Sequence, residues 1–340
     1  MSTALVISGG GSKGAFAVGA IKAMFRQRPG LSFDMLIGTS TGALIAPLAT
    51  AKDIALLEQL YTSVTTEQVI TTHNVGNRIL TADSIFGVEP LARLLTQYYT
   101  DAFFSDLVAR PYNVVLATTC LQTEAAVYFS SRNLSKPTEH EVVTLKQADH
   151  FRRAVLASAC QPVFMTPIEV IPGAQPLRQY VDGGVREYAG IQLAIEQGAD
   201  EVFVILLSPE INPPVEKRYN SVPDILMRTI EIFSEDVGEN DLRMPQLYNK
   251  GLSYIDTVRQ NLSDHGLPAS QIDALLNVPG NPFSNQRSVN LHLIRPDGHL
   301  GGGPGGLTFD PAEMKGMVAK GERTMNQYIA GLSPGSSILV

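Results

Sequence analysis

The first fifty residues contain one construction twice: an apolar run, a tight turn of small residues, and a segment with helical spacing. Residues 3–8 are a short, partly β-branched run that three consecutive glycines end, and residues 13–26 then place apolar side chains at helical spacing. The same order returns with residues 33–38 and 42–51. Two such units in succession favour a parallel sheet, because a helix between two strands returns the chain to the same starting edge.

The rest of the chain continues this alternation, which predicts an α/β fold with a largely parallel central sheet. The last helix has the best-defined start, with Asp310 at the N-cap, Pro311 at the first helical position and Glu313 where a capping box would place it. Further strands are expected over 112–119, 125–130, 200–208 and 288–294, and helices over 54–64, 89–100, 150–159, 223–237 and from Asp310 onward.

Length and composition fit a single globular domain. The 340 residues are 44% hydrophobic, and neither an internal repeat nor a long linker divides them, so we expect one domain over residues 1–340. The stretches 209–222 and 296–306, rich in proline and glycine respectively, are expected to be mobile surface segments.

The net charge of −7 and pI near 5.4 provide no broad basic field. Charge-driven binding to nucleic acid or to an anionic membrane is therefore not expected. Cys120 and Cys160 form neither a CxxC pair nor a disulfide framework and are interpreted as buried thiols in a reducing compartment. The N-terminal apolar run is too short for a signal peptide or a membrane span. We expect a cytoplasmic protein with peripheral membrane contact at most.

The pentapeptide Gly38-Thr39-Ser40-Thr41-Gly42 lies between a predicted strand and a predicted helix. In this context Gly-x-Ser-x-Gly indicates a nucleophile elbow, in which glycines two positions either side of the serine avoid collisions across a sharp turn. The helix N-terminus beneath Ser40 would favour developing negative charge. A plain turn with Ser or Thr as helix N-cap uses the same residue types, so the pentapeptide alone leaves both interpretations open.

The turn at residues 9–14, GGGSKG, is also flanked by a strand and a helix. Three consecutive glycines let backbone N–H groups converge on one anion, either a phosphate or the oxyanion of a tetrahedral intermediate. A dinucleotide site would place an acidic residue about 20 positions on, at the end of the next strand. Asp34 has this spacing but stands near that strand's beginning, which weakens the dinucleotide interpretation, and no Gly-Lys-Ser/Thr follows for a Walker A loop.

The tripeptide Asp182-Gly183-Gly184 follows the short run 179–181. Asp-Gly is a common turn dipeptide, so an ordinary turn explains the motif in isolation. A serine nucleophile nevertheless requires a base, and an aspartate on a glycine-rich turn can approach another backbone closely. The six histidines are scattered without metal-ligand spacing, so no metal site is expected, while a base from His292 or His299 stays formally open.

Taken together and in this order, the three motifs resemble those of the patatin-like phospholipases. Residues 157–170 are similar to the proline-containing block ahead of that family's Asp-Gly-Gly, and residues 309–325 to its closing helix, so the resemblance covers most of the chain. It implies a three-layer α/β/α sandwich and hydrolysis of lipid esters without metal or other cofactor. The positions that match are Ser40 and Asp182 as a catalytic dyad, Gly10 and Gly11 as the oxyanion hole, and Gly9, Lys13, Gly14, Gly38, Gly42, Gly183 and Gly184 as motif support.

The resemblance also implies a mechanism and a substrate class. Asp182 would accept the Ser40 proton as the hydroxyl attacks the ester carbonyl, and the glycine loop would bind the oxyanion of an acyl-enzyme reaction. The substrate expected is a phospholipid or other lipid ester, with no nucleic-acid partner. Insertions near 60–90 and 209–250 are expected to form a lid and acyl-chain walls.

Three other functions fit parts of the pattern. An acyltransferase or transacylase would use the same dyad with a second alcohol as acceptor. A nucleotide-binding α/β module would hold phosphates at the two glycine turns. A catalytically silent interaction protein is disfavoured by intact Ser40 and Asp182. The lipid head group, the acyl chain and the oligomeric state are not specified by the sequence.

Overall fold

The computed structural model describes residues 2–71, 82–212, 214–283 and 286–332. Its centre is an eight-stranded sheet made of β1 (Thr3–Ile7), β2 (Met35–Thr39), β3 (Asn113–Cys120), β4 (Ala126–Ser130), β5 (Glu141–Thr144), β6 (Tyr180–Asp182), β7 (Glu201–Ile205) and β8 (Asn290–Ile294). The strand order is β5-β4-β3-β2-β1-β7-β8, with β6 paired to β3 outside this path. Among these pairs only β3 with β4 and β3 with β6 are antiparallel.

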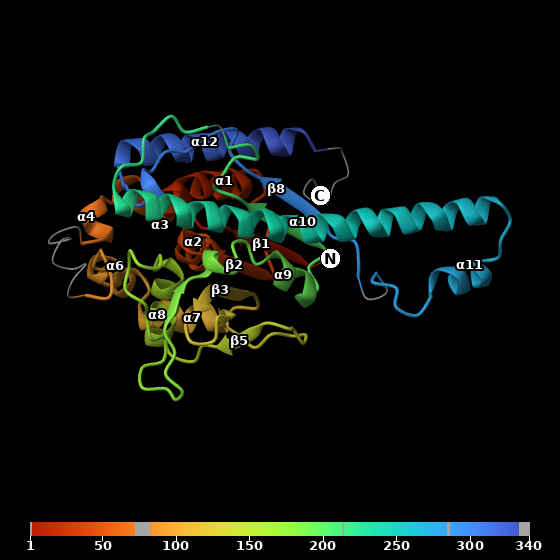
Figure 1. Ribbon diagram of the computed structural model, residues 1–340, viewed down its shortest axis with the longest axis horizontal. Coiled ribbons are helices and arrows are strands. Elements are labelled where there is room, and N and C mark those ends of the chain that lie inside the picture. The colour runs from red at the N-terminus through yellow and green to blue at the C-terminus, as the bar shows by residue number, and fades with distance from the viewer. Residues whose placement is uncertain (1, 72–81, 213, 284–285, 333–340) are drawn as a thin grey trace.

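Helices cover both faces of the sheet, which makes the fold a three-layer α/β/α sandwich, as expected (Figure 1). Alternate residues of β1 point to opposite faces, so Leu5 and Ile7 join one core while Ala4 and Val6 join the other. The first core packs against α1 (Gly14–Gln27), α2 (Thr41–Thr50), α3 (Ile54–Ser63), α6 (Glu89–Tyr98), α7 (Asp101–Ala109), α8 (Ala148–Ala159) and α12 (Pro311–Ala330), and the second against α9 (Ile191–Gln197) and part of α10 (Val222–Asp264).

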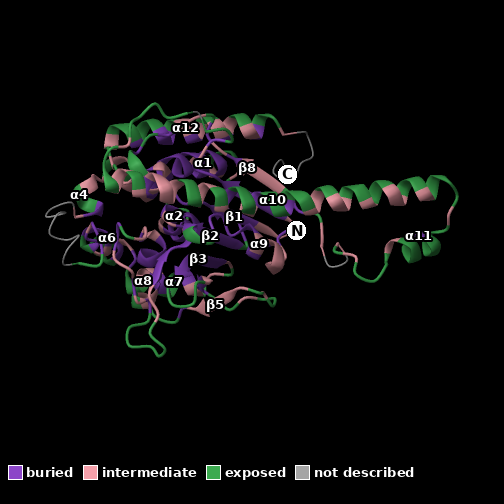
Figure 2. Cartoon of the chain, viewed as in Figure 1, coloured by how far each residue is buried: buried purple, intermediate pink, exposed green. Residues whose placement is uncertain are grey.

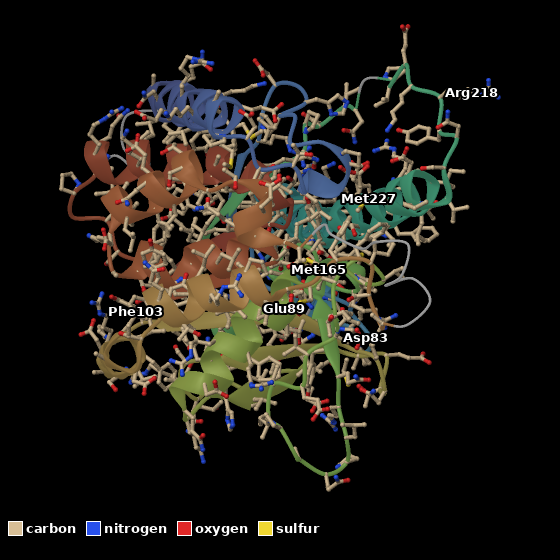
Figure 3. The ribbon with its side chains drawn as sticks, turned by 90° about the vertical axis from the view of Figure 1, so that its left-hand side faces the viewer. Asp83, Glu89, Phe103, Met165, Arg218 and Met227 are labelled. Atoms are coloured by element: carbon tan, nitrogen blue, oxygen red, sulfur yellow. The ribbon has the colours of Figure 1, made fainter. Side chains whose placement is uncertain are left out.

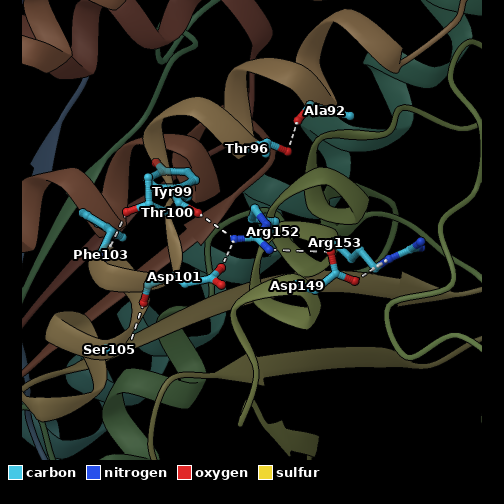
Figure 4. A network of polar contacts seen from close by, with 10 residues as sticks. All are labelled: Ala92, Thr96, Tyr99, Thr100, Asp101, Phe103, Ser105, Asp149, Arg152 and Arg153. Carbon is cyan, nitrogen blue, oxygen red and sulfur yellow. Dashed lines mark hydrogen bonds and ion pairs between the residues drawn. The ribbon is translucent and has the colours of Figure 1, made fainter.

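A network of charged contacts holds the junction between α6 and α7 against α8 (Figure 4). Arg152 of α8 donates to the backbone oxygen of Tyr99 at 3.1 Å and to Asp101 Oδ1 at 2.7 Å. Arg153 donates to Asp149 Oδ2 at 3.1 Å one turn away on the same helix. These contacts fix the position of α6, which forms a wall of the cleft described below.

Helix α10 is much longer than the predicted helix over 223–237. It contains 43 residues, about 65 Å at about 1.5 Å per residue. Gly238 and Pro245, which usually weaken or break a helix, lie inside it. The part beyond Pro245 projects from the sandwich, carries no buried residue among those described, and has α11 (Ala269–Leu276) near its far end (Figures 1 and 2).

Of three expectations about the C-terminal part, one is confirmed and two need correction. Asp310 caps α12 as predicted, since its Oδ1 accepts the N–H groups of Ala312 and Glu313 at 2.8 and 2.9 Å. The Glu313 carboxylate does not close a capping box but accepts the Gly302 N–H at 3.1 Å. The stretch 296–306 is not a plain surface loop, because Gly302 and part of its surroundings are buried against the first glycine turn.

The two expected insertions correspond to different structures. The one near 60–90 contains the end of α3, the short α4 (Thr66–Val69) and the start of α6, while residues 72–81 lie outside the described residues. The one near 209–250 contains a coil followed by the first part of α10. Strands β5 and β6 were not predicted, because four and three residues are too few to show a period.

Candidate active site

Strand β3 brings Ser40 and Asp182 together. Strand β2 pairs with the first part of β3 and ends with Thr39 opposite Ala117. Strand β6 pairs with the next part in the opposite direction and ends with Asp182 opposite Thr118. Because β4 occupies the other edge of β3, the ends of β2 and β6 meet on the same edge. The residue after β2 and the last residue of β6 are therefore neighbours.

Ser40 occupies a strained turn between β2 and α2. Its φ of 56° and ψ of −121° lie in a region that costs a non-glycine residue about 1–3 kcal/mol. The Ser40 N–H donates to Ser158 Oγ at 3.0 Å, and the Ser158 hydroxyl donates to the Ala117 oxygen at 2.6 Å. Ser158 thus ties the turn to β3. Sequence reasoning missed this role, and a serine among the apolar residues in the last turns of α8 was its only signal.

The glycines on either side of Ser40 have a steric reason in this geometry. A Cβ on Gly38 would lie 2.3 Å from the Gly42 oxygen, and a Cβ on Gly42 would lie 2.1 Å from the Ile7 oxygen of β1. Both distances are far below van der Waals contact, so a side chain at either position would force the turn open.

Asp182 is buried, with 9% of its surface exposed. Its side chain lies close to that of Ser40 in the cleft lining, and its Oδ1 accepts the Gly184 N–H at 2.8 Å. Burial raises the pKa of the carboxyl from an ordinary 3.8 to about 6, while the hydrogen bonds from Ser40 and Gly184 limit the rise. Asp182 is therefore ionised at neutral pH and is a stronger base than an exposed aspartate. The adjacent Gly183 allows the close approach to β3, since its Cβ would lie 2.5 Å from the Ala117 oxygen.

The first glycine turn runs directly beside Ser40. A Cβ on Gly9 would lie 3.0 Å from the Ser40 Cβ. Gly10 and Gly11 have φ values of 150° and 58°, and within the described part of the chain neither of their N–H groups donates to a protein acceptor. Backbone N–H groups without a partner, next to a serine hydroxyl, are suited to bind an oxyanion.

Residues from two other elements support this turn. Tyr188 donates its hydroxyl hydrogen to the Gly9 oxygen at 3.0 Å. A Cβ on Gly14 would lie 2.4 Å from Thr41 Oγ1, so the starts of α1 and α2 are in direct contact. Thr41 in turn hydrogen-bonds to the buried Tyr61 hydroxyl. Neither tyrosine could be predicted from its local sequence, because each partner is distant along the chain.

Tyr188 is itself held by α10. Asp241 Oδ2 accepts the N–H groups of Tyr188 and Ala189 at 2.8 and 3.1 Å. Burial raises the pKa of Asp241, and burial together with the nearby Asp241 carboxylate raises the pKa of Glu187. The first part of α10 therefore fixes the segment that follows Asp-Gly-Gly.

Ser40, Asp182 and the glycine turn line one cleft that opens to solvent. Lys13 also lines it. Apolar walls with a few convergent polar groups are typical of a site for a partly apolar ligand. Figure 3 looks onto this end of the molecule, with the wall residue Met165 near the middle of the view. The other wall residues include Leu44, Val69, Leu91, Leu207, Ile230, Glu231, Glu235, Gly305 and Phe309.

The alternative histidine base is not supported. Within the described ranges no histidine lines the cleft. His292 lies in β8, where its Nδ1 is 2.7 Å from the Tyr328 hydroxyl and its Nε2 is 3.4 Å from Glu201 Oε1. His73 lies outside the described residues.

The structure also bears on the metal and nucleotide interpretations. No group of three or more His, Cys, Asp or Glu side chains is placed to hold a metal ion, as far as the described residues extend. Asp34 precedes β2 and its Oδ2 accepts the Thr3 N–H at 2.9 Å, so it lies at the opposite end of the sheet from residues 9–14. Asp34 therefore does not provide the acidic partner that a dinucleotide site requires.

Two features relate to the environment of the protein. Cys120 and Cys160 are buried free thiols, as expected. None of the helices in the described ranges combines the length and apolar character that crossing a bilayer requires.

Comparison with known proteins identifies the family. A sequence model described as Patatin-like phospholipase matches residues 5–195, more than half of the chain. Among solved structures, VipD from Legionella pneumophila is similar over 97% of this chain and 66% of its own, with 14% identity and a TM-score of 0.45. The type III effector protein ExoU is similar over 99% of this chain and 76% of its own, with 13% identity and a TM-score of 0.28. This chain thus spans slightly less than two thirds of VipD.

A search of curated protein sequences gave no match. The family assignment therefore depends on the sequence model alone, whose matched range includes Ser40, Asp182 and the glycine turn. The chain belongs to the patatin-like phospholipase family.

Proposed function

We propose that this protein is a serine acyl hydrolase that cleaves phospholipids or related lipid esters with a Ser40–Asp182 dyad. The observation that carries the proposal is the placement of Ser40 next to a buried Asp182 at the ends of β2 and β6, beside the N–H groups of Gly10 and Gly11. Membership of a phospholipase family supports the class of reaction.

The proposed reaction has two stages. Ser40 Oγ attacks the ester carbonyl while its proton passes to Asp182, and the oxyanion receives hydrogen bonds from Gly10 and Gly11. The intermediate expels the alcohol, which takes the proton from Asp182, and leaves an acyl-enzyme on Ser40. Water then gives its proton to Asp182 and attacks the acyl group, which releases the carboxylic acid and restores Ser40. Each oxyanion donor is worth about 3 kcal/mol of barrier.

We further propose that the acyl chain occupies an apolar pocket between α2, α3 and α6. Its described lining residues are all Leu, Val, Tyr or Phe. The pocket shares four residues with the catalytic cleft, so the two spaces lie side by side. Leu44 stands one helical turn after Ser40, so an acyl chain that enters the pocket past Leu44 would keep its ester carbon near Ser40. The shared residues are Leu44, Val69, Leu91 and Phe309.

The domain organisation and location that we propose follow from these features. Residues 2–332 act as one catalytic domain in which the first part of α10 and the segment from α3 to α6 form the walls of the cleft. Buried free thiols suit a reducing compartment such as the cytoplasm, and lipid would enter through the open mouth of the cleft.

The test is covalent labelling of Ser40. A fluorophosphonate should add once to the wild-type protein, as seen by intact mass, and should not add to Ser40→Ala, which should also lack esterase activity. Esterase activity retained by folded Ser40→Ala would exclude the assignment. Fatty acid release measured with and without a second alcohol separates hydrolase from transacylase, since a transacylase forms a new ester instead of free acid.

A further inference from the structure

A second glycine-rich loop lies against the first. Residues 301–306, GGGPGG, fall outside the range matched by the family model, 5–195. A Cβ on Gly306 would lie 2.2 Å from the Gly10 oxygen, and a Cβ on Gly11 would lie 2.2 Å from the Gly306 oxygen. The two backbones are therefore in direct contact, and neither leaves room for a side chain.

Two helices anchor this second loop through its backbone. The Gly305 N–H donates to Glu231 Oε1 of α10 at 2.5 Å, and Arg228 pairs with the other oxygen of the same carboxylate at 3.1 Å. The Gly302 N–H donates to Glu313 of α12 at 3.1 Å. The loop is thus tied on both sides to long helices, which makes it a firm support for whatever it touches.

The contact acts on the peptide that carries one oxyanion donor. The Gly10 oxygen and the Gly11 N–H belong to the same planar peptide unit. Gly306 packs against that oxygen, so a fixed oxygen fixes the direction of the N–H group on the opposite side. Gly10 and Gly11 both have positive φ, and glycine readily adopts other conformations when nothing restrains it.

We propose that the 301–306 loop and Glu231 are positioning elements of the oxyanion hole. They hold the peptide between Gly10 and Gly11 so that the Gly11 N–H points at the reacting carbonyl. This inference rests on the proposed function of Ser40, and it extends the catalytic unit beyond the residues that the family model matches. A displaced donor weakens binding of the transition state more than binding of the ground state, so the loss should appear in kcat.

The test compares Gly306→Ala with Gly298→Ala. At position 298 an added Cβ meets nothing within 4 Å, so this variant, from the same stretch, controls for a general effect of alanine. Removal of an oxyanion donor lowers kcat about 100- to 1,000-fold, and we expect a displaced donor to lower it about 10- to 100-fold, with KM changed less than about twofold. Gly298→Ala should retain the wild-type kcat. Folded Gly306→Ala with kcat within about twofold of wild type would overturn the proposal.

Glu231 provides a second test that does not perturb the crowded glycine contact. Glu231→Gln keeps an oxygen that accepts the Gly305 N–H, whereas Glu231→Ala removes it. Glu231→Gln should therefore retain at least about tenfold more kcat than Glu231→Ala. A loss confined to KM, or equal losses in the two variants, would assign Glu231 to substrate contact or charge and overturn the positioning role. Absence of Ser40-dependent hydrolysis in the wild type would instead refute the proposed function, and with it this inference.

Discussion

Asp182→Asn should make the protein inactive and more stable, by an amount that depends on pH. The pKa of Asp182 is raised from 3.8 to about 6 by burial, so the folded state holds this proton more tightly than the unfolded state. The wild type therefore loses stability as pH rises from about 4 to about 6 and stays lower above that range. At about 1.36 kcal/mol per pKa unit, the loss is about 3 kcal/mol. Asparagine cannot ionise, so the Asp182→Asn variant does not lose this unfolding free energy.

Urea unfolding at pH 4 and pH 8 measures this effect. The difference in unfolding free energy between Asp182→Asn and wild type should increase by about 3 kcal/mol from pH 4 to pH 8. Other buried acids such as Glu187 and Asp241 are present in both proteins and cancel in the difference. Ser40→Ala removes a hydrogen bond that favours the ionised carboxylate, so its stability should fall more steeply with pH than that of wild type. A difference that does not change with pH would refute the assignment of a buried, ionised Asp182.

Two further predictions concern catalysis by the wild type. The pH profile of kcat/KM should rise about tenfold per pH unit below pH 6 and level off above it, because Asp182 must be ionised to accept the Ser40 proton; a flat profile from pH 4.5 to 8 would contradict this. For a series of esters, kcat/KM should increase about fourfold per added methylene, which corresponds to about 0.8 kcal/mol, until the pocket between α2, α3 and α6 is full. Leu94→Trp, which adds volume in that pocket, should move the plateau to shorter chains, and an unchanged plateau would place the acyl chain elsewhere.

Local features of the fold were predictable from the sequence, and the contacts between distant segments were not. The turn around Ser40 depends on residues within two positions of it, so Gly38 and Gly42 reveal its shape. The partnership of Ser40 with Asp182 depends on β6 pairing with β3, and three residues carry no periodic signal for such a pairing. It could be expected only because the three motifs occur together.

The missed supports share one physical reason. Ser158, Tyr188 and Glu231 each bind a backbone group that is far away in the chain, and composition near these residues does not indicate it. The glycines of the loop 301–306 led us to expect a mobile segment. In the structure they instead let two backbones pack in direct contact. Glycine stands at position 238 inside α10 because the Tyr188 ring occupies the space that a side chain would fill.

The pairing of β2 and β6 along one edge of β3 limits which changes of sequence leave the dyad intact. Thr39 and Asp182 lie opposite consecutive residues of β3, Ala117 and Thr118. The pairing with β3 therefore determines the distance between the two residues of the dyad. The chain between the two motifs can lengthen or shorten without altering that spacing. A slip of one residue along β3 would shift one partner by about 3.3 Å and turn its side chain to the other face. Insertions that reshape the cleft walls are therefore compatible with unchanged chemistry, whereas the pairing register of β3 is not free to vary.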